Sequence, residues 1–151
     1  MPSMDESPPD PTAATVAENI RRARARRGKS TYELSALLTE AGHTVSQSAL
    51  SRMERGLQRV TVSDLMALAV VLDVSPLGLL LPLGDDGAEA VDVTGGGTLP
   101  LHRAWSWAQG YEPLNPEGDP RTAAWEFRLY SLPPGLRHLP GNPYLTMEGD
   151  E

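Results

Sequence analysis

Residues 15–82 contain five short stretches in which apolar side chains recur three or four positions apart, and no other feature constrains the fold as much. Residues spaced in this way lie on one face of an α-helix. The stretches begin at serine or threonine and several stop at glycine, residues that favour the beginning and the end of a helix. The spacing therefore predicts five short helices that form a small all-α domain.

The first two predicted helices are separated by a glycine. The first covers residues 15–27, with Thr15 and Glu18 as a capping box at its beginning. The second begins at Ser30 or Thr31 and ends about three turns later at another glycine. Each helix therefore has a defined beginning, a defined end and an apolar face.

The third predicted helix is short and unusually polar. It follows the N-cap residue Ser46, has a narrow apolar stripe at Leu50 and Met53, and ends at a glycine. Most of its remaining surface carries hydrogen-bonding groups, which suits contact with another polar surface. The fourth and fifth helices are predicted at residues 61–72 and 75–81.

The net charge of −7 is unevenly distributed along the chain. Residues 15–60 carry nine bases and four acids, which gives +5, whereas residues 85–151 carry four bases and eleven acids, which gives −7. The local field of a basic segment, and not the total charge, governs which polyanion can approach it. The charge pattern is therefore compatible with nucleic-acid binding by residues 15–60.

Three motifs within residues 15–82 resemble those of the lambda-repressor-like, Xre-type (Cro/cI) helix-turn-helix family. They are the entry to the second helix at residues 30–34, the third helix with its glycine at residues 46–56, and the Leu-Asp-Val-Ser exit at residues 72–75. One departure is that residues 39–44 are several residues longer than the tight turn of the family. The resemblance implies a five-helix DNA-binding domain.

The resemblance also implies roles for particular residues, because in this family the third helix enters the major groove while the second crosses the DNA backbone. Residues expected at base edges are Ser46, Gln47, Ser48, Ser51 and Arg52. Residues expected at phosphates are Ser30, Thr31, Arg55, Gln58 and Arg59. Arg24 and Glu54 are expected to form a structural ion pair. The residue types fit, since glutamine can bind adenine and arginine can bind guanine with two hydrogen bonds each. The alternative is that these side chains form an ordinary solvated surface.

Enzymatic, metal-binding and membrane functions are not expected. The chain has no cysteine, and its three histidines are scattered singly, so we predict no metal site and no cofactor. Residues 28–30 imitate the end of a phosphate-binding loop, but Ala23 stands where that motif needs its first glycine. The longest apolar run, residues 65–72, is shorter than the roughly 18 residues of a membrane span. The beginning of the chain lacks the features of a secretory signal. We therefore expect a cytoplasmic protein.

The segments outside the predicted domain differ in composition. Residues 1–14 are expected to be a disordered acidic tail, and the glycine-rich residues 83–100 a flexible linker. Seven of the eight aromatic residues lie beyond residue 104. Residues 119–131 fit a helix or a strand, and we favour a helix that begins at Asp119 and Pro120.

Residues 101–151 are predicted to be an interaction or oligomerisation segment. Trp105 and Trp107 are expected on one face of an extended stretch. The aromatic residues either pack on their own domain or form a surface for a second copy or another protein, because such residues are enriched at interfaces. The candidate contact residues are Trp105, Trp107, Trp125 and Phe127.

Taken together, the sequence predicts a transcriptional regulator that binds double-stranded DNA sequence-specifically, acts as a repressor and forms a homodimer. The alternative is a protein-interaction adaptor, such as the antitoxin of a toxin pair. In that case the helix-turn-helix domain only autoregulates, while the C-terminal segment binds a partner protein.

Overall fold

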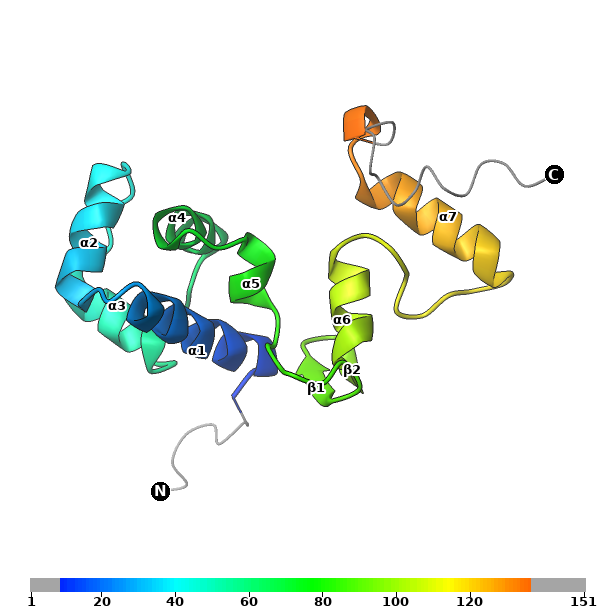
Figure 1. The fold of residues 1–151 in the computed structure, drawn as a ribbon, viewed down its shortest axis with the longest axis horizontal. Coiled ribbons are helices and arrows are strands. Elements are labelled where there is room, and N and C mark those ends of the chain that lie inside the picture. The colour runs from blue at the N-terminus through cyan, green and yellow to red at the C-terminus, as the bar shows by residue number, and fades with distance from the viewer. Residues whose placement is uncertain (1–8, 137–151) are drawn as a thin grey trace, which may run out of the picture. The chain divides into compact units, whose positions relative to one another are not determined.

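The computed structural model describes residues 9–136. Within them the protein is mostly helical, with seven α-helices and one two-stranded sheet (Figure 1). The described residues divide into two compact units, the first ending at Leu101 and the second beginning at His102. The predicted helical fold class is confirmed, with the small sheet as an addition.

The five helices predicted for the first unit are all present. Ser30 caps the second with the capping box that joins it to Glu33, and Ser46 caps the third. Thr61 caps the fourth and Ser75 the fifth. The helices are α1 (Pro11–Arg26), α2 (Thr31–Glu40), α3 (Gln47–Glu54), α4 (Val62–Leu72) and α5 (Pro76–Leu80).

The predicted beginning of α1 is wrong. The helix begins at Pro11, and the carboxylate of Asp10 caps it by accepting a hydrogen bond of 2.8 Å from the Ala13 backbone N–H. Asp followed by Pro is itself a strong helix-start signal, but it precedes the first buried residue of the helix. Thr15 therefore lies inside α1, and residues 11–14 are helical and not part of a disordered tail. The expectation for residues 1–8 lies outside the described residues.

Every helix of the first unit contributes to one core. The largest fully buried side chains are Ile20, Leu34, Leu38, Leu50, Leu68, Leu72 and Leu79. Burying one such side chain contributes about 1.5 to 3 kcal/mol. One buried polar residue, Asn19, donates hydrogen bonds of 3.1 and 2.8 Å to the backbone carbonyls of Leu79 and Leu81, which fastens the end of α5 to α1.

The prediction of a flexible linker at residues 83–100 is wrong for its second half, which forms a β-hairpin. Strand β1 (Ala90–Val93) pairs antiparallel with β2 (Gly97–Pro100), and Val91 lies opposite Leu99. Both of these side chains are buried. The glycines that suggested flexibility supply the turn, because Gly95 and Gly97 adopt positive φ angles of 77° and 69° that favour glycine.

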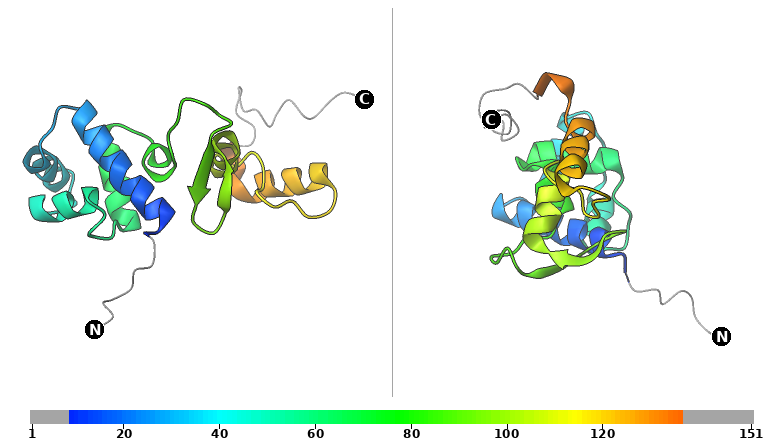
Figure 2. Two further views of the ribbon diagram at one scale, coloured as in Figure 1. Left: turned by 90° about the horizontal axis from the view of Figure 1, so that it is seen from below. Right: turned by 90° about the vertical axis from the view of Figure 1, so that its right-hand side faces the viewer.

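The hairpin is attached to the beginning of α1 (Figure 2). The backbone N–H of Thr94 donates to Thr12 Oγ1 at 3.0 Å, and the hydroxyl of Thr94 donates to the carboxylate of Asp10 at 2.8 Å. The hairpin is therefore part of the same unit as the five helices.

The second unit contains most of α6 (Leu101–Ala108), together with α7 (Pro120–Ser131) and the 3-10 helix η1 (Pro134–Leu136). The predicted helix at α7 is confirmed, and Asp119 caps it by accepting a hydrogen bond of 2.9 Å from the Thr122 backbone N–H. The extended conformation predicted for Trp105 and Trp107 is wrong, because both lie in α6. Alternation of two tryptophans resembled a strand, but Leu101 and Ala104, which are three apart and both buried, follow helical spacing. The expectations for residues 137–151 lie outside the described residues.

Within residues 9–136, no helix has the length and apolar character needed to cross a membrane.

Candidate nucleic-acid interface

Helix α3 has an apolar face and a polar face. Ala49, Leu50 and Met53 are buried in the core. At about 100° per residue, the side chains at positions 47, 48, 51, 52 and 55 share an arc of about 140° on the opposite side. Of these, Gln47, Ser48, Arg52 and Arg55 are exposed and Ser51 is half-buried. The core therefore fixes the orientation of α3 and turns one continuous polar surface outward.

Ser46 has a defined structural role at the beginning of α3. Its hydroxyl accepts a hydrogen bond of 3.1 Å from the Ala49 backbone N–H and lies 3.2 Å from the hydroxyl of Ser48. A serine N-cap stabilises a helix by about 1 kcal/mol. The predicted base contact of Ser46 would therefore be an addition to its capping role.

Gln47 links the predicted base-contacting residues to the predicted phosphate-contacting residues. Its amide nitrogen donates to the hydroxyl of Thr31 at 3.3 Å, which joins the first turn of α3 to the first turn of α2. The structure thus brings together two residues that are 16 positions apart in the sequence and were assigned to different contacts.

Arg52 is held in a comparable way by Gln58, which lies in the loop between α3 and α4. The Nε and Nη2 atoms of Arg52 donate to Gln58 Oε1 at 3.0 and 2.6 Å, respectively. Sequence reasoning assigned Arg52 to a base and Gln58 to a phosphate, and gave no indication that the two side chains bind each other.

Arg24 and Glu54 connect α1 to the end of α3. The Arg24 Nε and Nη2 atoms donate to the two carboxylate oxygens of Glu54 at 2.5 and 2.8 Å, and Arg24 Nη1 donates to the backbone carbonyl of Lys29 at 2.8 Å. The Arg24 side chain is 20% exposed and that of Glu54 is 7% exposed. The hydrogen bond with Glu54 raises the pKa of Arg24 above its ordinary value. A carboxylate bound in this way is directed at α1.

The N-terminus of α2 carries an acidic group that the predicted phosphate contacts did not take into account. The Glu33 carboxylate accepts a hydrogen bond of 2.7 Å from the Ser30 backbone N–H, and this bond lowers the pKa of Glu33. Because the Ser30 N–H is already bound, a phosphate at this end of α2 must bind other N–H groups in the first turn of the helix. The Ser-x-x-Glu spacing of a capping box was the signal that could have indicated this.

The predicted phosphate-contacting residues come from the beginning of α2 and from the segment that follows α3. Ser30, Arg55 and Arg59 are exposed, whereas Thr31 and Gln58 are half-buried.

Two arginines of α1 are partly neutralised within their own helix. Arg21 and Arg22 both bind the carboxylate of Glu18, with N–O distances of 2.6 and 2.9 Å. The hydrogen bond from Arg21 lowers the pKa of Glu18 to about 2. The exposed basic groups nearest the end of α1 are Arg26 and Arg27.

The long turn between α2 and α3 is fixed at several points. His43 Nε2 donates to Asp64 Oδ1 of α4 at 2.7 Å, and the hydroxyl of Ser35 donates to the backbone carbonyl of Val45 at 2.6 Å. Burial alone would raise the pKa of Asp64, but the hydrogen bonds from His43 and Thr61 lower it. The extra length of this turn therefore does not leave α3 loosely attached. Sequence reasoning assigned no role to His43.

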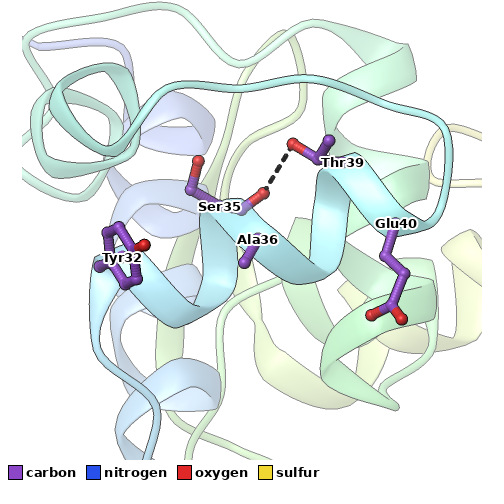
Figure 3. Close-up of a pocket in the computed structure, with 5 residues that line it drawn as sticks. All are labelled: Tyr32, Ser35, Ala36, Thr39 and Glu40. Atoms are coloured by element: carbon purple, nitrogen blue, oxygen red, sulfur yellow. Dashed lines mark hydrogen bonds between the residues drawn. The ribbon is translucent and has the colours of Figure 1, made fainter.

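An open recess lies along the outer face of α2 (Figure 3). Its wall includes the hydroxyl of Thr39, which donates to the backbone carbonyl of Ser35 at 3.1 Å. The recess is lined by Tyr32, Ser35, Ala36, Thr39 and Glu40. Its one charged side chain is acidic, so it does not favour a phosphate. Among residues 9–136, no three His, Asp or Glu side chains gather where they could hold a metal ion.

Comparisons with known proteins bear on the first unit. Residues 20–79 match the family described as helix-turn-helix. A solved structure titled as that of the hypothetical transcription factor NHTF from Neisseria is 27% identical, with a TM-score of 0.43, and the match covers 53% of this chain and 88% of that chain. The search of curated proteins found no match.

The fold and the family match assign residues 20–79 to the helix-turn-helix class, and this match supports a DNA-binding regulator. More particularly, residues 20–79 form an Xre-type, lambda-repressor-like helix-turn-helix domain.

Proposed function

We propose that the protein recognises specific sequences in double-stranded DNA by placing α3 in the major groove. The observation that carries this proposal is the division of α3 into a buried apolar face and an outward polar face that holds Gln47, Ser48 and Arg52. The major groove is about 12 Å wide and admits an α-helix.

The side chains on this face match the chemistry of base edges. Gln47 would bind the N6 and N7 atoms of adenine, and Arg52 the O6 and N7 atoms of guanine, each pair contributing about 1 to 3 kcal/mol of discrimination. The hydroxyls of Ser46, Ser48 and Ser51 can donate to or accept from several bases. This arrangement is compatible with readout of a few successive base pairs by one copy of the domain.

The phosphate contacts would come from the elements on either side of α3. Ser30 and Thr31 lie at the beginning of α2, where backbone N–H groups favour anions. Arg55, Gln58 and Arg59 lie at the end of α3 and in the following loop. Contacts of this kind set the position of the protein on DNA but carry no sequence information.

The test is selection from a random-sequence duplex pool by the intact chain and its variants. Gln47→Ala and Arg52→Ala should each change the preferred base at one position, whereas Arg59→Ala should weaken binding to all sequences alike. If Arg59→Ala altered the base preference and Arg52→Ala did not, the proposed recognition surface would be wrong.

Salt dependence provides a second test. If each copy neutralises several phosphates, log K should fall against log salt with a slope of about −0.9 per contact, and Arg59→Ala should reduce that slope by about one. A slope near zero would contradict groove docking.

We further propose that the protein acts as a repressor and binds as a homodimer. One domain supplies one α3, and helix-turn-helix dimers place two such helices in half-sites one helical turn apart. A dimer bound at its operator would exclude polymerase. Sedimentation should give a dimer for the intact chain, and a monomer for a chain that ends at Leu101 if residues 102–151 provide the pairing.

A second candidate function is the binding of another protein through the C-terminal unit. The observation in its favour is that α7 has no buried residue, and that Trp125 and Tyr130 are 62% and 84% exposed. The predicted contacts of Trp105, Trp107 and Phe127 would belong to the same unit. A stoichiometric protein that co-purifies with the intact chain, and is lost from a chain ending at Leu101, would favour this function over homodimer formation.

A further inference from the structure

The contact between Arg52 and Gln58 determines which part of the arginine is available to DNA. A guanidinium group is planar and has five N–H donors. Gln58 Oε1 accepts from Nε and from Nη2, so it occupies the side edge of the group. The neighbouring end edge, formed by Nη1 and the second hydrogen of Nη2, is not used in this contact.

We propose that Gln58 is a positioning residue that fixes Arg52 so that this remaining edge meets guanine. The inference rests on the proposed function, in which Arg52 contacts a base, and it replaces the phosphate contact expected for Gln58. Two parallel donors on one edge match the O6 and N7 acceptors of guanine. Gln58 would then determine specificity without touching DNA.

The backbone after α3 places Gln58 at Arg52. The N–H of Leu57 donates to the carbonyl of Arg52 at 2.9 Å, and that of Gly56 donates to the carbonyl of Met53 at 3.1 Å. Gly56 makes this return possible because its φ angle is 70°, in the region that favours glycine. The chain therefore turns back at the end of α3. Gln58, which follows Leu57, is half-buried.

The side chain of Gln58 suits this role chemically. Its amide oxygen accepts both hydrogen bonds without adding a negative charge near the DNA backbone. An exposed arginine without a partner loses rotamer freedom when it binds, whereas an arginine already held in place loses less. For one rotamer-rich side chain this difference corresponds to about two- to tenfold in affinity.

The experiment compares variants of the intact chain by selection from a random-sequence duplex pool. Gln58→Met keeps the length of the side chain and removes the amide oxygen. It should reduce the preference for guanine about two- to tenfold, at the same position where Arg52→Ala removes that preference. In the Arg52→Ala background, Gln58→Met should cause no further change in base preference.

Gln58→Glu tests whether the acceptor is what matters. A carboxylate oxygen can accept the same two hydrogen bonds, so the guanine preference should be retained. The negative charge of this carboxylate should weaken binding to all sequences, because residue 58 lies on the surface proposed to face DNA. Gln109→Met is the matched control, since it makes the same substitution in the second unit and should leave the preference unchanged. The far-ultraviolet circular dichroism signal of the helices, followed during heating, confirms that each variant is folded at the selection temperature.

Three outcomes would overturn the inference. If Gln58→Met weakened all sequences equally and kept the base preference, Gln58 would be a phosphate contact. If Gln58→Glu lost the guanine preference as completely as Gln58→Met, the acceptor would not be the cause. If the wild-type chain enriched no sequence, the proposed function would fail and this inference with it, an outcome distinct from the other two.

Discussion

The two units of the chain begin their helices in the same way but differ in what those helices bury. Both α1 and α7 begin with an Asp-Pro pair in which the aspartate caps the helix. Helix α1 has five buried residues, whereas α7 has none. The difference shows that local capping decides where a helix begins, while burial depends on the neighbours that the rest of the chain supplies.

This difference also separates the proposed roles of the two units. In the first unit, fully buried leucines hold the polar face of α3 in one orientation, as recognition of base edges requires. In the second unit, large side chains such as Trp125 and Tyr130 lie largely exposed. An exposed apolar surface favours association with another molecule.

The largest expected effect comes from emptying the core of the first unit. Leu50→Ala removes a side chain that is fully buried in α3 and should lower the free energy of unfolding by about 3 kcal/mol. Trp125→Ala removes a larger side chain that is 62% exposed and should cost under about 1 kcal/mol. Urea denaturation followed by far-ultraviolet circular dichroism measures both changes.

The same experiment can separate the two units spectroscopically. All three tryptophans lie in residues 102–151, so tryptophan fluorescence reports on the second unit alone. Leu50→Ala should shift the circular dichroism transition much more than the fluorescence transition. A Trp125→Ala variant that is as destabilised as Leu50→Ala would remove the contrast between the units.

The next effect concerns the ion pair that fastens α3 to α1. Glu54→Ala leaves Arg24 without its partner and should cost about 2 kcal/mol, between the values for exposed and fully buried pairs. Removing both groups, in Arg24→Ala with Glu54→Ala, should cost less than the sum of the two single changes. Additive losses would show that the pair contributes no coupling energy.

The smallest effect is the acid sensitivity of the turn between α2 and α3. The folded-state pKa of Asp64 lies below its ordinary value, so the ionised carboxylate favours the folded state. This contribution is complete above the unfolded-state pKa of about 3.9 and is lost as the pH falls through the lower, folded-state pKa.

Asp64→Asn should therefore be about 1 kcal/mol less stable than the wild type at pH 6, and the gap should close toward pH 2. Chemical denaturation across this range provides the measurement. A gap that stayed constant with pH would assign the loss to the capping hydrogen bonds of Asp64 and not to its charge.

The sequence predicted local features of the fold better than features that depend on other elements. Ser30, Ser46 and Ser75 marked the beginnings of α2, α3 and α5 because a cap is a property of a few consecutive residues. The hairpin was missed because the glycine content of its surroundings outweighed the alternation of Val91 and Val93 with polar neighbours. In α6, the alternation of Trp105 and Trp107 predicted an extended stretch although Leu101 and Ala104 follow helical spacing. In α7, spacing alone could not distinguish a helix from a strand.

In the candidate site too, features local to one helix could be predicted, and contacts between elements could not. Helical spacing indicated which side chains of α3 share a face, since that depends on α3 alone. The contacts of Arg52 with Gln58 and of His43 with Asp64 depend on how a loop returns to a helix, which spacing does not specify. The capping role of Glu33 was local, and its Ser-x-x-Glu pattern was present in the sequence.

The hydrogen bonds between Thr94 and the beginning of α1 join the two ends of a segment, residues 10–94, that contains all five helices of the first unit. Adjacent ends are the condition under which a stretch of chain can be carried in a surface loop of another protein without stretching either chain. In engineering terms, the five helices form one closed loop of polypeptide that a host protein could hold between two neighbouring residues.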